Sequence, residues 1–97
     1  MVKPWPLESA ALGEFHEGKL IRAEGEVLRT TADLPYGHKL FLRLATGGEV
    51  QVFLPAGTKP DEAMLTAGRR LQVTGFCAQY DRVYEIVPRS AKDLRAQ

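Results

Sequence analysis

Aromatic, basic and amide side chains alternate with branched aliphatic residues in two neighbouring segments. Phe41 and Arg43 alternate with three leucines, and Gln51 and Phe53 alternate with two valines and a leucine. Successive side chains of a strand point to opposite faces, so leucines and valines in a core leave the other four on one open face. Rings on such a face stack on bases of any identity, and cations contact phosphates. These four residues form the primary candidate binding site.

Two segments beside these runs carry side chains suited to the same chemistry. Thr30 to His38 contains Pro35 and Gly37 among short polar residues, which is typical of a loop, and Tyr80-Asp81 predicts a tight turn. Hydroxyl, aromatic and basic side chains in loops contact the backbone of a nucleic acid or stack on its bases, although solvated turns explain them equally well. The loop candidates are Tyr36, His38, Lys39, Tyr80 and Arg82.

The aromatic pair also has an explanation without nucleic acid. Phe41 and Phe53 would be covered if Trp5, Leu7 or Phe15, or a second subunit, packed on them. The chain has 13 Lys and Arg against 12 Asp and Glu, a net charge of +1, whereas nucleic-acid-binding domains are commonly more basic. A protein-interaction or self-association domain is therefore the alternative to binding single-stranded DNA or RNA.

The sequence lacks the residue patterns of catalysis. Glu24 and Glu26 lie two apart on one predicted strand face, but no partner or pocket is evident that would shift their pKa values. His16, His38 and Cys77 make no metal-ligand spacing, and there is no phosphate-binding glycine loop or nucleophile elbow. We expect a binding protein rather than an enzyme, with no metal and no cofactor.

Length and composition indicate the class of protein. A chain of 97 residues suits one domain, and a single cysteine excludes an internal disulfide and agrees with a reducing compartment. No apolar run reaches membrane-spanning length, and the first thirteen residues lack the apolar segment of a signal peptide. We expect a cytoplasmic protein that does not associate with membranes.

Alternation with a period of two predicts a mainly β protein. Short helices are predicted at Leu7–His16, ending before Gly18, and at Pro60–Ala67, ending at Gly68. Residues 1–17 are expected to form an N-terminal arm with the short helix, and residues 90–97 a surface tail. The five predicted strands are Ile21–Val27, Leu40–Leu44, Val50–Leu54, Leu71–Gln79 and Val83–Val87.

Two of these strands begin with the same pattern. Residues 18–27 and 68–77 share a glycine, a basic residue, alternating apolar residues and a second glycine, Gly25 or Gly75, at the same spacing. A glycine within a strand usually marks a bend or a close backbone approach. Small barrels need such bends because their strands must coil to close.

The segments 18–27, 40–54, 68–77 and 84–88, in this order and with a helix between the third and fourth strands, resemble the small OB-fold nucleic-acid-binding domains of the anticodon-binding-like branch. The resemblance covers about residues 18–89. It implies a five-stranded Greek-key barrel whose ligand lies across the second and third strands, between the loops joining strands one to two and four to five. The fold would also allow oligosaccharide recognition, for which the residues offer little support.

Overall fold

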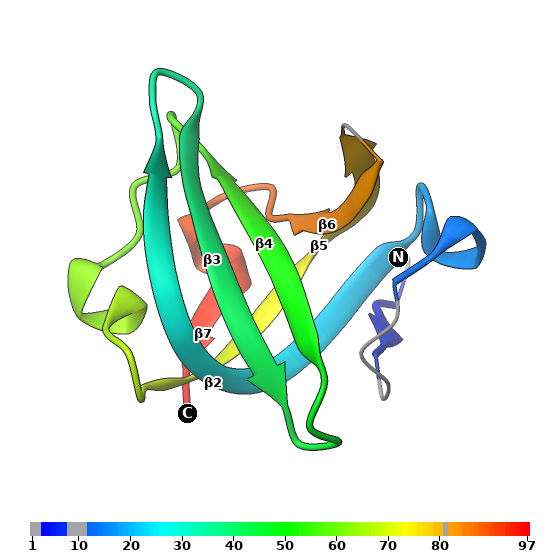
Figure 1. Cartoon of the computed structure of the whole chain (residues 1–97), viewed down its shortest axis with the longest axis horizontal. Coiled ribbons are helices and arrows are strands. Elements are labelled where there is room, and N and C mark those ends of the chain that lie inside the picture. The colour runs from blue at the N-terminus through cyan, green and yellow to red at the C-terminus, as the bar shows by residue number, and fades with distance from the viewer. Residues whose placement is uncertain (1–2, 8–11, 81) are drawn as a thin grey trace.

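The alternating segments form a mainly β structure, as predicted. The computed structural model describes residues 3–7, 12–80 and 82–97, leaving aside the Phe15 side chain. Each predicted strand lies within an observed one, and two short strands flank them (Figure 1). The strands are β1 (Trp5–Pro6), β2 (Leu20–Asp33), β3 (Gly37–Leu44), β4 (Glu49–Pro55), β5 (Arg70–Tyr80), β6 (Val83–Val87) and β7 (Leu94–Ala96).

The strands form one sheet that curls back on itself. β2, β3 and β4 pair in antiparallel succession, and β4 meets β6 in parallel through Val52 and Ile86. β6 pairs with β5, which pairs in turn with the first half of β2, so five strands form a partial ring. β1 lies parallel to β2, and β7 lies antiparallel to β5. The 14-residue β2 can serve two neighbours because its first half pairs with β5 and its second half with β3.

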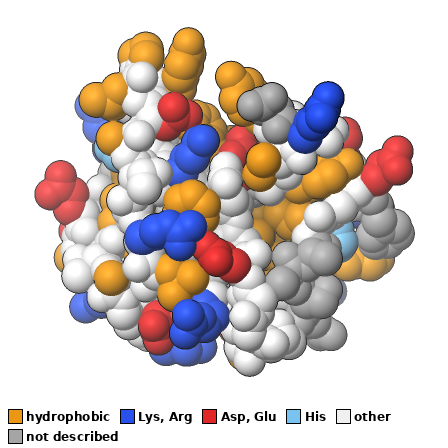
Figure 2. Space-filling view, viewed as in Figure 1, with side chains coloured by type: hydrophobic (Ala, Val, Ile, Leu, Met, Phe, Trp, Pro, Cys, Tyr) orange, Lys and Arg blue, Asp and Glu red, His pale blue; other side chains and the backbone are white. Residues whose placement is uncertain are grey.

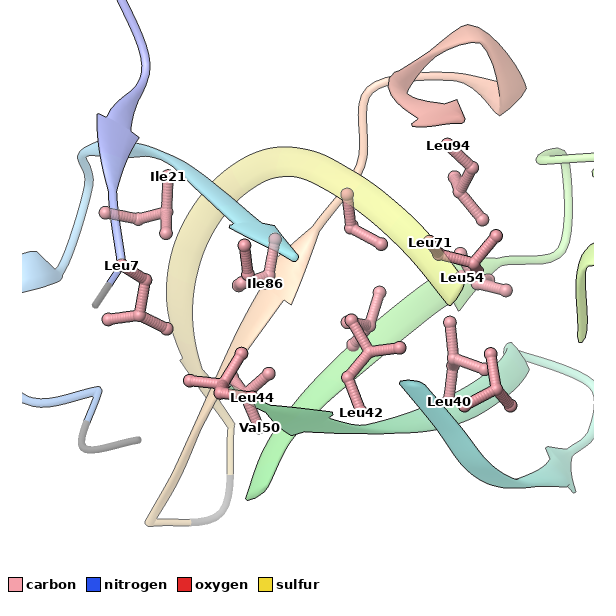
Figure 3. Packing of buried hydrophobic residues seen from close by; sticks show 14 of the residues in the cluster. Leu7, Ile21, Leu40, Leu42, Leu44, Val50, Leu54, Leu71, Ile86 and Leu94 are labelled. Atoms are coloured by element: carbon pink, nitrogen blue, oxygen red, sulfur yellow. The ribbon is translucent and has the colours of Figure 1, made fainter. Parts of the chain in front are cut away.

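The side chains inside this ring are the aliphatic residues of the alternating pattern. Leucines, valines and two isoleucines from β2 to β6 make up most of the buried cluster (Figure 3). Ala23 and Cys77 belong to it as well. Leu7 and Leu94, from outside the five strands, also belong to it. Burial of this apolar surface is the main force that holds the strands together. The inward-facing leucines and valines predicted at positions 40–44 and 50–54 are confirmed.

The two glycines of the repeated pattern lie where their strands change partners. Gly25 pairs with both Leu71 of β5 and Leu44 of β3. Gly75 pairs with Ile21 of β2, beside the point where β5 begins to pair with β6. A Cβ atom on Gly25 would overlap the Arg43 carbonyl oxygen, and one on Gly75 would lie 2.5 Å from the carbonyl carbon and oxygen of Val87. Both glycines therefore permit a close backbone approach, as predicted.

Neither predicted helix is observed among the described residues. The segment 60–67 forms only a 3-10 turn at Glu62–Leu65, capped by the Asp61 carboxylate and ended by the extended backbone of Thr66. The Gly68 amide then donates to the Val27 carbonyl, which returns the chain to the sheet before a second turn can form. The predicted helix at 7–16 lies partly outside the described residues, and its described C-terminal part is a 3-10 turn at Glu14–His16.

Two segments predicted as irregular are ordered by pairing. The loop predicted at 30–38 is mostly strand, because β2 and β3 continue their pairing to Asp33 and Gly37 around a turn that contains the cis Leu34–Pro35 peptide. The segment predicted as a tail at 90–97 contains a 3-10 turn and β7, and Leu94 is buried in the core. One segment was predicted as a loop and the other as a surface tail, whereas pairing with distant strands orders both.

We expect Asp93→Asn to destabilise the protein by about 1 kcal/mol at pH 7. Asp93 accepts hydrogen bonds from the Arg89 backbone amide, Nε and Nη2 at 2.9, 3.0 and 3.1 Å, which fixes the turn before Leu94. These bonds hold the pKa of Asp93 below its usual value, so the stabilisation is present at neutral pH and is lost as the pH falls through the lowered pKa. Urea unfolding at pH 7 and in acid checks this, and equal unfolding free energies of the two proteins at pH 7 would contradict it.

Candidate functional site

The outward faces of β3 and β4 carry the predicted side chains. Phe41 and Arg43 point away from the core on β3, and Gln51 and Phe53 do so on β4. Phe41 lies opposite Gln51, and Lys39 lies opposite Phe53, so these side chains are cross-strand neighbours. Both phenylalanine rings are half-buried rather than fully exposed.

A cleft of about 310 Å³ lies at one end of this face. The β2–β3 and β5–β6 hairpins extend to the same end of the molecule and flank it (Figure 1). Figure 2 shows hydrophobic side chains on both tips with a hollow between them. The cleft is lined by Asp33, Tyr36, Lys39, Phe53, Tyr80 and Glu85.

The aromatic walls of the cleft come from three different parts of the sheet. Tyr36 lies in the β2–β3 turn, Phe53 on β4, and Tyr80 at the end of β5. The Tyr36 backbone is fixed, since its amide donates to Asp33 at 2.8 Å and its carbonyl accepts from Ala56 at 2.9 Å. The side chains remain accessible, with Tyr36 66% and Tyr80 68% exposed. The cleft therefore combines anchored backbone with rings open to a ligand.

Glu85 is the most buried of the polar residues that line the cleft. It is only 6% exposed, and one carboxylate oxygen, Oε2, accepts a 2.9 Å hydrogen bond from Nε2 of Gln51. Burial raises the pKa of Glu85, an effect that is reduced by the Gln51 hydrogen bond and the Lys39 charge and enhanced by Asp33. Gln51 thus acts at the cleft indirectly, by holding Glu85.

The Phe41 ring already has a cation of the protein over its face. The Arg29 guanidinium lies 4.0 Å from the centre of its ring and forms a 3.0 Å ion pair with Glu49. Such a cation over the ring face competes with a stacking ligand. Phe41 and Arg43 lie on the same face as the cleft but do not line it. The aromatic rings that line the cleft are those of Tyr36, Phe53 and Tyr80, so Phe53 is the one member of the predicted phenylalanine pair among them.

The remaining predicted residues are placed around the cleft rather than in it. His38 is exposed on the opposite face of β3, beyond the end of the core. Arg82 is exposed in the β5–β6 turn, with a φ of 69°. Of the nine candidates, the cleft is lined by Tyr36, Lys39, Phe53 and Tyr80.

The N-terminal segment leaves the cleft uncovered where it is described. Trp5 pairs with Ile21 and lies near Lys19, whose Nζ is 5.6 Å from its ring centre. Leu7 is buried in the core cluster. Neither residue lines the cleft, so Trp5 and Leu7 do not form the cover considered for Phe53.

Sequence reasoning missed two carboxylates of the cleft. Asp33 lies in a segment that was predicted as a loop. Its position beside β3 could not be predicted, because it depends on β2 and β3 continuing their pairing to Asp33 and Gly37. Glu85 could have been identified from the sequence, because it is the one charged residue within the strand Val83–Val87. A charged side chain in an otherwise apolar strand either faces solvent or lines a site.

We expect Glu85→Gln to stabilise the protein at neutral pH and to flatten its pH dependence. Because the folded protein binds a proton on Glu85 more tightly than the unfolded chain, stability falls as the pH rises from the ordinary pKa of 4.5 through the raised value. A neutral amide avoids that loss and can still accept from Gln51. Urea unfolding between pH 4 and 8 checks this, and a destabilised variant with unchanged pH dependence would contradict it.

Two features of other classes of protein are absent from the described residues. No group of three or more His, Cys, Asp or Glu residues within it could hold a metal ion. No helix in it is long and apolar enough to cross a membrane. In comparisons with known proteins, no family model and no curated protein matches this sequence.

Proposed function

We propose that this protein is an OB-fold module that binds single-stranded DNA or RNA without catalysis. The order of the five ring strands supports the fold, since β2, β3, β4, β6 and β5 pair in that order and β5 returns to β2. In OB folds the ligand lies across the second and third strands, between the loops joining strands one to two and four to five. In this chain those two strands would be β3 and β4, and those two loops would be the turns of the β2–β3 and β5–β6 hairpins. The cleft is lined by residues of both hairpins and of β4, which supports the proposal.

The observation that carries the proposal is the set of three aromatic rings around the cleft. Tyr36, Phe53 and Tyr80 come from both hairpins and from the strand between them. The volume of about 310 Å³ falls at the lower end of the range of small-ligand sites, about 300–1,000 Å³. Rings placed this way suit an unpaired base, whose faces are free to stack.

Basic side chains near the cleft would neutralise the sugar–phosphate backbone. Lys39 lies inside the cleft, Arg82 beside Tyr80, and Arg43 farther along the outward face of β3. These three cations are few, and the net charge of the whole chain is only +1. Few phosphate contacts predict a modest dependence of affinity on salt.

Fluorescence anisotropy with labelled 12-mers of DNA and RNA tests the proposal. We expect binding at 20 mM salt that weakens steadily toward 300 mM, because each phosphate contact releases condensed counterions. The corresponding duplex should bind more weakly, because its bases are already stacked. Failure of every single-stranded 12-mer to bind at 20 mM salt would reject the proposal.

The two carboxylates favour one alternative, a protein-interaction domain. Asp33 and Glu85 beside three aromatic rings would suit an arginine or lysine side chain of a partner or of a second copy of this chain. Light scattering over a range of concentrations tests self-association, in which Tyr80→Ala should dissociate the oligomer. A monomer at every concentration would reject the self-associating form.

A further inference from the structure

The residues that line the cleft include a buried hydrogen-bond acceptor, the Glu85 carboxylate. Glu85 is more than nine-tenths buried, yet its side chain lines the cleft. Its only hydrogen bond within the described residues is the one that Oε2 accepts from Gln51. The described residues include no fully buried side-chain oxygen or nitrogen without a partner, so the second oxygen, Oε1, is not fully buried. Because Glu85 lines the cleft, the cleft is where a ligand can reach this oxygen.

Glu85 shares the cleft lining with one other carboxylate and one ammonium group. Asp33 adds a second carboxylate from the end of β2, and Lys39 supplies an ammonium group from β3. Lys39 and Glu85 line the same cleft, and the positive charge of Lys39 partly offsets the rise in the pKa of Glu85 that burial causes. Gln51 fixes the Glu85 carboxylate from β4, so the acceptor is held in position before a ligand arrives.

The pairing edges of the bases differ in how well they match this arrangement. Guanine presents two adjacent donors, N1–H and the N2 amino group, beside the acceptor O6. Uracil and thymine present one donor between two carbonyl oxygens, which a carboxylate repels. Adenine and cytosine each offer one amino donor beside an acceptor nitrogen. Guanine alone would direct two donors to Glu85 and an acceptor toward Lys39.

We propose that the cleft selects guanine in single-stranded nucleic acid, with Glu85 accepting from the guanine donor edge and Lys39 donating to O6. The proposal rests on the proposed function, because the stacking rings must first hold an unpaired base. Tyr36, Phe53 and Tyr80 supply the stacking, which is indifferent to the base, and Glu85 supplies the discrimination. The ion pair of Arg29 with Glu49 occupies the neighbouring part of the face, outside the cleft.

Binding of 12-mer oligouridylates with a single central substitution tests the proposal. The central position carries guanosine, inosine or uridine, and inosine lacks only the N2 amino group of guanosine. We expect guanosine to bind about 10-fold more tightly than uridine, and inosine to fall between them. Glu85→Gln should reduce the guanosine preference to about 2-fold, because the amide no longer offers a charged acceptor to the guanine donors. The all-uridine 12-mer should bind the variant at least as tightly as it binds the wild-type protein, because the amide does not repel the uracil carbonyl oxygens as the carboxylate does.

Glu24→Gln is the matched control for the change of charge. Glu24 also accepts a 2.9 Å hydrogen bond from a glutamine, Gln72, but it lies outside the cleft. Its substitution should keep the full preference for guanosine. A circular dichroism spectrum and a thermal melt of each variant verify that the fold is retained.

The outcomes separate the two proposals. If all three 12-mers bind equally to the wild-type protein, or if the preference survives Glu85→Gln, guanine selection is wrong while nucleic-acid binding stands. If no 12-mer binds, both proposals are wrong. Binding of an oligoarginine peptide at the cleft in preference to every 12-mer would overturn both and assign the carboxylates to a cationic protein segment.

Discussion

Replacing Gly75 by alanine is expected to destabilise the protein by about 3 kcal/mol, a large part of the stability of a domain of this size. A Cβ atom there would lie 2.5 Å from the carbonyl group of Val87 and 2.7 Å from the nitrogen of Pro88. These are backbone atoms of the β6 end, and no side-chain rotation can relieve the overlap. Gly25→Ala should act similarly, because its Cβ atom would meet the Arg43 backbone.

The control for this prediction is Gly57→Ala. Gly57 has no atom within 4 Å of an added Cβ, and its backbone is outside the left-handed region. Its substitution should change stability by less than about 0.5 kcal/mol. Urea unfolding followed by circular dichroism measures all three variants. If the Gly75→Ala and Gly57→Ala variants unfold at the same urea concentration, the close approach of the Gly75 backbone to Val87 and Pro88 is not needed for stability.

Removing both hairpin tyrosines is expected to weaken single-strand binding by about 30-fold or more. Each stacked base contributes about 1–3 kcal/mol, and Tyr36 and Tyr80 stand on opposite sides of the cleft, so their effects should add. Both rings are well exposed, so their loss should leave the fold intact. Anisotropy titrations of Tyr36→Ala, Tyr80→Ala and the double variant measure the change.

Phe76→Ala is the control variant, because it removes an exposed aromatic ring outside the cleft. Phe76 is 44% exposed on β5 and does not line the cleft. Its substitution should leave the affinity within about 2-fold of wild type. Wild-type affinity in the double tyrosine variant would show that any nucleic acid binds at another surface.

The strands could be predicted because the alternation of apolar and polar residues that identifies each strand lies within the strand itself. Alternation at positions 40–44 and 50–54 fixes which side chains face the core, whatever the rest of the chain does. The glycine pattern likewise located the two points at which strands change partners. The short segment 60–67 was misjudged because proline, acidic and apolar residues favour the start of a helix locally, while its end is fixed by Gly68 bonding to β2.

The candidate site was only partly predictable, because it is assembled from distant segments. Lys39 and Phe53 face outward through alternation alone, whereas Tyr36 and Tyr80 meet them only because two hairpins reach the same end of the sheet. Arg29 lies opposite Phe41 only because the pairing of β2 with β3 shifts register between Val27 and Arg29. The local sequence pattern does not predict such a shift. Glu85 enters the cleft through the pairing of β6 with its neighbours, which is also nonlocal.

The most direct test of the central claim is a map of amide chemical shifts in the ¹⁵N-labelled protein during titration with a single-stranded 12-mer. We predict that the largest changes fall in the two hairpins and the facing part of β4, at Tyr36, Lys39, Phe53 and Tyr80. The far end of the sheet, around Trp5 and Thr46, should stay unchanged. Saturating changes confined to that far end, or none at all, would contradict the account.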